Sequence, residues 1–491
     1  MLPAPAGGFP QTPPASLSNG GFSITWGMDD KIHTPYAEVI DFSLSHELSH
    51  GFVVEGSYIG RLSHHLLQEE DLAMPLDLRD PKSGMSYFQA ATALSKAADK
   101  GVNIASLAPI PYWENMFPGA AGHLGFGPPG SSSNLGCAIG DSASARNYTA
   151  TQAVYDMWSC YIGNETSALF NLDLPDNCLP ACSAVTGQQG YAYFDPQWSS
   201  LYAWRSIGNA AYNGLQLMAR HKGHGLDFDF NYTYSKSIDV GSNTERINEF
   251  QGSGFASQVI NAWAPQQLRA VSDFDTTHQF NSDWVYELPV GKGKQFGSRM
   301  HGVGQALFGG WTISGIFRLT SGYPFTVEPG LGYWATNWQL TSAAVLNGKA
   351  PKTGVFTDPS GNPNVFQGDP TKLGIVQNYN GDGATDSITA CPAGGCTWRV
   401  SYPGESGQRN NFRGPGYFGI DAGLAKVWNL TERQDIRFSW ETFNVTNTPR
   451  FDVGQLQNGG NNSLNTGATF GEYGKTMTLP RIMQFTLRYA F

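Results

Sequence analysis

From Met483 to Phe491 the chain alternates between large apolar side chains and polar or small ones. The large apolar side chains occupy Met483, Phe485, Leu487, Tyr489 and Phe491. A period of two predicts a β-strand with two unlike faces. A membrane barrel turns such an apolar face to lipid, whereas an edge strand of a soluble sheet buries it against a second sheet. This segment alone leaves both interpretations open.

The same alternation predicts earlier strands along the chain. They span 36–48, 52–61, 213–220, 226–235, 277–288, 311–320, 417–428 and 433–444. The clearest is 226–235, where five apolar or aromatic side chains face one way and five polar ones face the other. A shift of one residue would exchange these faces, so the register is strongly specified. With the terminal segment, 480–491, the sequence predicts about nine strands, in keeping with an all-β fold.

The connections between these strands alternate between short and long. The short or medium ones are 49–51, 221–225, 289–306 and 429–432, and the long ones are about 66–205, 239–275, 322–415 and 446–479. A soluble meander has no reason to keep its long loops on one side. Outer-membrane barrels, in contrast, have short periplasmic turns and long extracellular loops. We therefore predict an antiparallel transmembrane β-barrel, with the long loops outside and Phe491 at the periplasmic rim.

Two further segments complete the predicted organisation. Residues 1–35 are rich in Pro, Gly and Asn, and we interpret them as an extracellular loop or N-terminal extension. Residues 36–491 form the barrel portion, with one helical segment near 86–100 inside the first long loop. Nine is an odd count, whereas single-chain bacterial barrels have even counts, so we expect a partial barrel whose earlier strands lie elsewhere. Its polar face would line a wet lumen, because only small barrels fill their interior with side chains.

Composition agrees with a barrel. Charged residues make up only 14% of the chain, against about 25% in ordinary soluble domains. No stretch approaches the roughly 18 consecutive apolar residues of a spanning helix. The net charge of −10 and the lack of a basic face argue against a nucleic acid partner. The first residues show neither the basic start nor the apolar run of a signal peptide.

The chain has six cysteines, all in stretches rich in Gly, Pro or Asn. An even set on loops indicates disulfides in an oxidising compartment. Cys391 and Cys396 enclose only four residues, so we expect these two to pair. The remaining four allow three connectivities, and they are Cys137, Cys160, Cys178 and Cys182. A zinc cluster is the alternative, but the spacing and the lack of flanking histidines disfavour it.

Two metal-like motifs need a separate interpretation. His46, Glu47 and His50 spell the metalloprotease pattern, which requires a helix, but the alternation here predicts a strand followed by a turn. A second stretch resembles the start of a calcium loop, with Asn378, Asn380, Asp382 and Gly383. Its twelfth position is Thr389 where a bidentate Glu is required, so we expect an ordinary turn. The sequence therefore predicts no metal site and no cofactor.

Tryptophans in the predicted outer loops are the candidate ligand contacts. The candidates are Trp334, Trp338 and Trp398. Exposed rings of this kind stack on saccharides or peptides. The alternative is that these rings build the loops' own apolar core, and the sequence leaves both open. No Ser/His/Asp or Cys/His arrangement and no phosphate-binding loop occurs at informative spacing, so we do not expect an enzyme.

Several segments together resemble a known family. They are YNGLQ at 212–216, GLDFDFNYTYSKSID at 225–239, GGWTISGIFRLTSGYPFTV at 309–327, the segment 420–452 and the terminal RIMQFTLRYAF. They resemble the C-terminal barrel half of TonB-dependent outer-membrane receptors, in the branch with an N-terminal carboxypeptidase-regulatory-like domain. The resemblance implies a barrel of about 22 strands around a plug. We expect this chain to be a truncated receptor that lacks the plug, the TonB-contacting segment and the early strands of that family.

The resemblance also implies function and partners. A receptor of this family sits in the bacterial outer membrane, contacts lipid, and imports a large nutrient such as a saccharide, peptide or chelate. It is energised by the TonB system, here through an N-terminal part that we expect to be missing from this chain. The terminal strand, with its apolar residues counted back from Phe491, resembles the signal that the barrel-assembly machinery reads. A surface adhesion or assembly protein that uses the barrel as an anchor is the alternative, and a soluble β-protein or metalloprotease is a third possibility.

Overall fold

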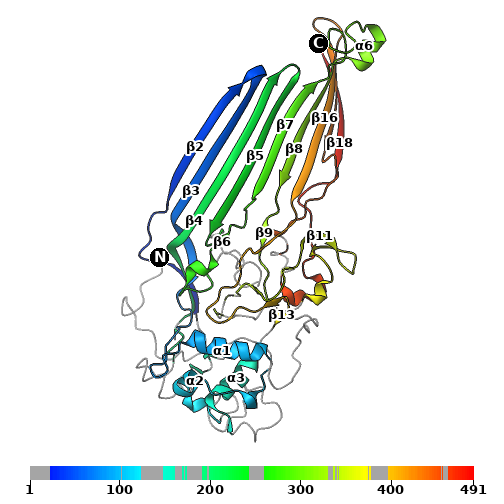
Figure 1. The fold of residues 1–491 in the computed structure, drawn as a ribbon. Coiled ribbons are helices and arrows are strands. Elements are labelled where there is room, and N and C mark those ends of the chain that lie inside the picture. Colours follow the sequence, from blue (N-terminus) through cyan, green and yellow to red (C-terminus); the bar gives the residue numbers. More distant parts are fainter. Residues whose placement is uncertain are drawn as a thin grey trace, which may run out of the picture.

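Nine long strands form one antiparallel sheet that carries the rest of the chain (Figure 1). The computed structural model describes residues 23–100, 102–122, 147–160, 169–170, 172–173, 191–195, 198–242, 259–329, 336–337, 340, 342–373, 375–376, 396–454, 456 and 463–491. The long strands are β2 (Tyr36–Leu48), β3 (Phe52–Asp71), β4 (Trp198–Gly223), β5 (Leu226–Asp239), β7 (His278–Glu287), β8 (Trp311–Thr320), β16 (Tyr417–Asn429), β17 (Asp435–Phe443) and β18 (Ile482–Ala490). Each of the nine predicted strands is present, and chain neighbours pair side by side from β2 to β18.

Several strands have the length that a membrane requires. Strands β7 and β8 have 10 residues each, and β17 and β18 have 9. A tilted transmembrane strand needs about 9–11 residues. No helix in the described part of the chain is long and apolar enough to cross a membrane.

Strands β3 and β4 are much longer than predicted. The pairing continues to Asp71 with Tyr202, past irregularities in register between Ser63 and Gln68. Such irregularities interrupt the alternation of faces while hydrogen bonding continues. The predicted strands at 52–61 and 213–220 were therefore too short, and the connection predicted at 66–205 spans only 72–197.

The prediction of a loop throughout residues 1–35 is wrong for β1 (Ser23–Met28). This strand pairs in parallel with the extended end of β4, from Trp198 to Trp204. The segment is short and contains Gly27, so its own sequence carries too little alternation to signal a strand. The partner surface exists only because β4 continues beyond its predicted start.

The register gives the sheet two continuous, unlike faces. Residues that pair directly across neighbouring strands lie on the same face. Phe228 pairs with Trp284, and Phe280 pairs with Leu319, which in turn pairs with Phe418. The opposite face carries mainly polar side chains, among them Asp41, Ser43, Glu55, Ser57, Gln216, Asp229, Asn231, Asn281, Asp283, Arg318, Asp421, Glu441, Gln484 and Arg488. The predicted two-faced sheet is confirmed across all nine strands.

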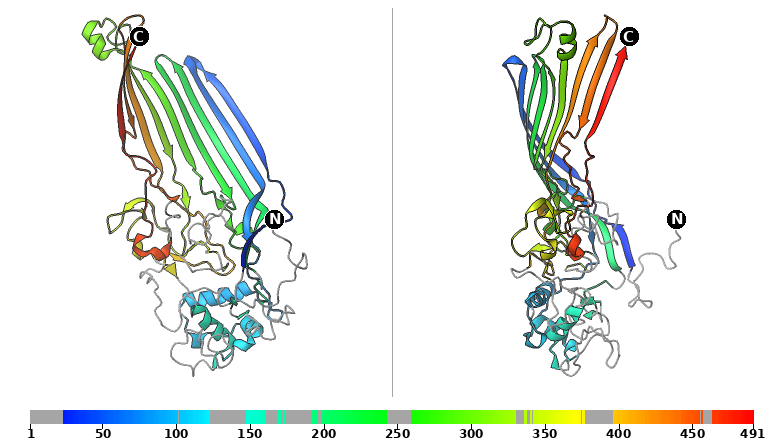
Figure 2. Two further views of the ribbon diagram at one scale, coloured as in Figure 1. Left: turned by 180° about the vertical axis from the view of Figure 1, so that it is seen from behind. Right: turned by 90° about the vertical axis from the view of Figure 1, so that its right-hand side faces the viewer.

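The two ends of the sheet differ as the connections predicted (Figure 1). The short turns and the C-terminus lie at one end, and the long connections lie at the other. In the turn after β2, His50 and Gly51 have positive φ. His46 lies in β2 and His50 lies in this turn, so the two histidines do not share the α-helix that the metalloprotease motif requires. A short helix, α6 (Gly302–Phe308), lies in the connection between β7 and β8, at the same end as the C-terminus (Figure 2).

The sheet is open in the described residues. Its path ends on β2 at one edge and on β18 at the other, and these two strands do not pair with each other. This agrees with the predicted partial barrel. Every interior strand is hydrogen-bonded on both sides, so the two edges are the places where further strands could add.

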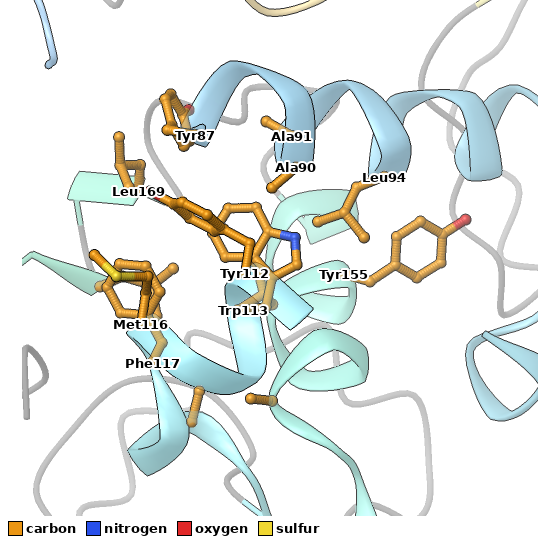
Figure 3. Packing of buried hydrophobic residues seen from close by; sticks show 14 of the residues in the cluster. Tyr87, Ala90, Ala91, Leu94, Tyr112, Trp113, Met116, Phe117, Tyr155 and Leu169 are labelled. Atoms are coloured by element: carbon orange, nitrogen blue, oxygen red, sulfur yellow. The ribbon is translucent and has the colours of Figure 1, made fainter. Parts of the chain in front are cut away.

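The described residues of the first long connection form a helical lobe with a core of its own (Figure 3). It contains α1 (Tyr87–Asp99), α2 (Pro111–Met116) and α3 (Ala150–Cys160). The helix predicted near 86–100 is confirmed as α1, and it begins with a capping box between Ser86 and Gln89. Tyr112 and Tyr193 share a buried hydrogen bond of 2.6 Å in this core.

A second lobe consists of short strands from the later loops. These are β9 (Pro324–Phe325), β10 (Val345–Leu346), β11 (Thr353–Thr357), β12 (Pro363–Phe366), β13 (Ile375–Val376), β14 (Trp398–Arg399) and β15 (Phe412–Arg413). Nearby, β6 (Ala270–Val271) pairs antiparallel with the last residues of β5. Their buried residues pack with side chains of 453–473, so the loops predicted at 322–415 and 446–479 share one core. Both lobes lie at the end of the sheet with the long connections (Figure 1).

Candidate functional site

The apolar face carries aromatic rings and histidines near both of its ends. At the loop end, Tyr36 stacks on His64 with ring centroids 5.0 Å apart, and the Tyr232 hydroxyl lies 2.8 Å from Nδ1 of His278. At the turn end, Trp311 meets Phe438 edge-on, and Tyr489 stacks on Phe491. Transmembrane barrels place aromatic girdles at both interfaces of an apolar band. The arrangement marks this face as the lipid-facing one.

The polar face forms a wall lined by charged and hydrogen-bonding groups. Near the short turns it is hollowed, with a volume of about 440 Å³. Its lining includes Arg220, Lys222, Asp229 and Asp283 from three neighbouring strands. Groups of both signs on one open surface suit a hydrated passage and not a dry core.

A buried ionic cluster joins the second lobe to the end of β5. The Arg409 guanidinium donates to Oδ1 of Asp239 at 2.8 Å and to Oδ1 of Asp273 at 2.7 Å. Its side chain is only 2% exposed. Burial lowers the pKa of Arg409, but the two carboxylates outweigh burial and hold the pKa above its usual value. The Asn410 side chain also donates to Asp273. Arg409 and Asn410 of the second lobe are therefore both bonded to the segment formed by the end of β5 and the residues after it.

Two other arginines make similar contacts at the same end of the sheet. Arg413 donates to the Asp275 carboxylate and to the carbonyl oxygen of Gly322 at 3.1 Å. Arg205 on β4 pairs with Asp29 at 2.7 Å and with Glu70 on β3. Arg413 thus attaches the second lobe to the segment before β7, and Arg205 ties together β4, β3 and the residue after β1 at the same end of the sheet.

Trp398, one of the predicted ligand contacts, is part of the core of the second lobe. It is fully buried, and its ring lies 5.6–5.9 Å from those of Phe366, Phe412 and Phe470. β14 is the middle strand of a three-stranded sheet, which encloses its side chains. Trp398 is therefore not accessible to a ligand. It belongs to the apolar core of the loops, which was the alternative interpretation of these tryptophans. Trp334 and Trp338 lie outside the described residues.

Other predicted sites fall mainly on residues that the structure does not describe. Cys396 is disulfide-bonded, but Cys391 lies outside the described residues, so their pairing stays a prediction. The calcium-like segment, Asn378 to Gly383, lies outside them as well. Within the described part of the chain, no three His, Cys, Asp or Glu side chains form a metal-binding group.

The structure places an exposed apolar patch where the sequence analysis did not expect one. We define the Trp263 patch as Trp263 and Leu76, the chain neighbour of Pro75, which are 55% and 37% exposed. The two segments touch, because Trp263 Nε1 donates to the carbonyl oxygen of Pro75 at 3.0 Å and the amide of Ala262 lies 3.3 Å from Sδ of Met74. The hydrogen bond fixes the indole while much of its surface stays in solvent. Trp263 could have been found as one more tryptophan in the loop predicted at 239–275.

A polar contact joins the two lobes. The Tyr402 hydroxyl donates to Oδ2 of Asp99, the last residue of α1, at 2.8 Å. The Arg399 guanidinium carbon lies 3.9 Å from the centre of the Tyr402 ring, and Lys96 lies on the same ring at 5.5 Å. Thr92 Oγ1 donates to the carbonyl oxygen of Pro403 at 3.3 Å. The helical lobe is therefore attached to segment 399–405 of the second lobe.

This contact predicts a pH-dependent stability of the lobes. Burial raises the pKa of Asp99 from 3.8 to about 6. The folded carboxyl then keeps its proton where the unfolded one loses it, so stability should rise as the pH falls from about 6 towards about 4. Asp99→Asn should remove this part of the pH dependence in thermal unfolding, and Glu432→Gln, in an exposed turn at the other end, should not. An unchanged profile for Asp99→Asn would contradict the assignment.

One comparison with known proteins, with a family model, agrees with this geometry. The family model described as outer membrane beta barrel domain matches residues 157–484. Among solved structures, the outer membrane transporter YddB from Escherichia coli has 8% identity and a TM-score of 0.32, covering 94% of this chain and 33% of that one. The FrpB iron transporter from Neisseria meningitidis has 8% identity and a TM-score of 0.30, with coverages of 95% and 33%. The chain thus spans about a third of the length of these structures, and no curated protein matches it.

Proposed function

We propose that this chain, which belongs to the outer membrane beta barrel domain family, supplies the C-terminal barrel wall of a TonB-dependent receptor. The protein lies in the bacterial outer membrane, and its family is one of membrane barrels and not a class of enzymes. Its proposed activity is the uptake of a nutrient too large for porins, such as a saccharide, a peptide or a chelate. The plug and the TonB-contacting segment of the proposed receptor would come from a part of it other than residues 1–491.

The observation that carries the proposal is the continuous polar face across nine strands. A small barrel fills its interior with side chains, whereas a wide one leaves an aqueous or plugged lumen. Here the polar face carries Arg, Asp, Glu and Asn side chains, as a hydrated wall requires. The open edges at β2 and β18 would pair with further strands, towards the roughly 22 strands of outer-membrane transporters. In the same proposal, residues 36–491 form the barrel portion, and residues 1–35 form an extension before it.

The long-connection end would face the outside of the cell and contact the ligand. This end has a preorganised surface, because each of the two lobes has its own core and three arginines form ion pairs there. A preorganised surface loses less conformational entropy when a ligand binds. The Trp263 patch is the best candidate contact on it, because an exposed and hydrogen-bonded indole can stack on a sugar ring or an apolar peptide side chain. The terminal strand, from Met483 to Phe491, would serve as the signal for the barrel-assembly machinery.

Uptake by the native cell tests this function. A strain without the gene should grow poorly on one class of saccharide, peptide or metal chelate, and re-expression should restore growth. A protonophore should abolish uptake while leaving binding to intact cells, because TonB-dependent import needs energy from the inner membrane. Normal uptake on every class, together with lost attachment to surfaces or other cells, would support a surface adhesion protein anchored by the barrel instead.

Trp263→Ala provides a residue-level prediction. If the indole stacks on the ligand, binding to intact cells should weaken about tenfold or more, as for other central aromatic contacts. Val355→Ala is the matched control, since Val355 is 48% exposed on the second lobe. Ligand binding by titration on whole cells, with surface display checked by an antibody, measures the difference. Equal loss in both variants would remove Trp263 from the proposed contact surface.

A further inference from the structure

Helix α6 lies against the lipid-facing side of the sheet rim. Trp311 and Lys426 pair across β8 and β16, and Lys426 pairs with Phe438 on β17, so all three belong to the apolar face. Trp428 lies two residues further along the same face. The helix contacts Trp311, Lys426 and Trp428, so it packs on the apolar face and not over the lumen (Figure 2).

These three side chains satisfy the carbonyl groups at the end of the helix. Lys426 Nζ donates to the carbonyl oxygens of Gln305, at 3.2 Å, and Gly309. The indole of Trp428 donates to Ala306 at 2.8 Å. The indole of Trp311 donates to Leu307 at 2.8 Å. The last carbonyl groups of a helix lack partners within it and attract positive charge, so the contact fixes the helix at the rim.

The contact also explains why a lysine stands on the apolar face. An uncompensated Lys facing lipid destabilises a barrel, least near the interfaces. Lys426 is 2% exposed, and its ammonium lies 5.2 Å from the centre of the Trp311 ring and 5.4 Å from that of Trp428. The helix, the lysine and the two indoles therefore form one unit on the rim.

The outer side of this unit is apolar and exposed. Val303 is 75% exposed, Leu307 57% and Phe308 62%, and Phe296 in the same connection is 58% exposed. Water is a poor environment for such a group of side chains, and exposed apolar patches mark interaction surfaces. The patch continues the apolar face of the sheet, which points to lipid as its occupant.

The charge of the connection identifies the kind of lipid surface. Residues 288–310 contain three Lys or Arg side chains, Lys292, Lys294 and Arg299, and no acidic one. Lys294 pairs with Glu287 at 2.8 Å, and Lys292 and Arg299 are exposed. Interfacial helices combine an apolar side that enters the acyl boundary with basic groups that attract anionic headgroups.

We propose that α6 is an interfacial anchor that inserts Val303, Leu307 and Phe308 into the periplasmic leaflet of the outer membrane. Lys292 and Arg299 would bind the phosphates of anionic phospholipids in that leaflet. The proposal rests on the proposed orientation of the sheet, with its short turns on the periplasmic side. It gives the rim a fixed depth in the membrane at the point where β7 and β16 end and β8 begins.

Depth-dependent fluorescence quenching tests the anchor. The full protein is labelled with an environment-sensitive fluorophore at Val303→Cys, Phe308→Cys or Ser298→Cys. It is then placed in phosphatidylethanolamine vesicles with or without phosphatidylglycerol. Doxyl groups high on the acyl chain should quench the probes at positions 303 and 308 several-fold more than the probe at 298. Phosphatidylglycerol should increase this quenching, and Lys292→Gln with Arg299→Gln should remove the increase.

The controls separate the helix from the sheet. A probe at Phe485→Cys, on the apolar face of β18, should be quenched by doxyl groups lower on the chain. If the probe at Phe485 is quenched while the probe at Val303 is quenched no more than that at Ser298, the anchor is overturned and the sheet stays in the membrane. The helix would then be available to a protein partner. No quenching at either site would overturn the membrane placement itself. Trp428→Phe, which keeps an aromatic side chain but replaces the indole and loses its N–H donor, should reduce quenching at Val303 while the probe at Phe485 is unchanged.

Discussion

Replacing Arg409 with Met should destabilise the outer lobes by about 3–5 kcal/mol, the cost of removing one partner of a buried ion pair. The substitution keeps much of the aliphatic volume but leaves the carboxylates of Asp239 and Asp273 without their guanidinium. Asp239 is only 5% exposed, so water can replace the lost donor only after the junction opens. Segment 396–416 should then exchange its amide hydrogens faster and become sensitive to protease on intact cells.

Two controls distinguish loss of the ion pair from loss of packing. Arg433→Met changes an exposed residue in the turn before β17 and should alter stability by no more than about 0.5 kcal/mol. Adding Asp239→Asn and Asp273→Asn to Arg409→Met removes the unpaired charges and should restore much of the stability. If Arg409→Met behaves like Arg433→Met, the junction does not hold the lobe.

Replacing Phe317 with Arg should cost about 2–4 kcal/mol of folding free energy in a bilayer, because the charge would face lipid near the centre of the apolar band. Phe317 lies midway along β8, and its ring meets those of Phe280 and Phe418. Folding can be followed by the shift in gel mobility between heated and unheated samples as urea is varied.

The neighbouring residue is the matched control for this substitution. Ile316 lies next in the same strand, points to the opposite face and is 41% exposed. Ile316→Arg should therefore be tolerated, because its charge would enter the hydrated side of the sheet. Equal costs at 316 and 317 would show that the two faces do not meet different solvents.

The sequence was sufficient to predict the central sheet, and the reason is physical. Each strand separates two different environments, so every second residue along it is constrained, as in β5 from Leu226 to Tyr234. The alternation of long and short connections predicted which strands pair and at which end the C-terminus lies. These constraints act locally along the chain and can be recognised without knowledge of tertiary contacts.

The elements that the sequence did not predict depend on tertiary contacts. β3 continues through bulges to Asp71, where pairing with β4 sustains the strand after the alternation stops. β1 is a strand because the extended end of β4 pairs with it. Neither feature has a periodic signal of its own.

The candidate site was harder to predict for the same reason. The sequence places Trp398 and Trp263 alike in loops, but the folded second lobe buries one ring and the segment around Pro75 leaves the other exposed. Whether a loop tryptophan meets a ligand or a core depends on packing between distant segments. The role of Lys426 was likewise hidden, because its partners come from a helix more than a hundred residues earlier.

A scan of β5 in outer-membrane vesicles tests the central claim most directly. Spin labels placed one at a time from Leu226 to Ser235 report collisions with oxygen, which dissolves in lipid, and with a charged nickel chelate, which stays in water. The account predicts a period of two, with oxygen favoured at Phe228, Phe230 and Tyr232 and the chelate favoured at Asp229 and Asn231. Equal access of the chelate to both sets, or exclusion of both reagents from the aromatic set, would contradict a sheet with one face in lipid and the other in water.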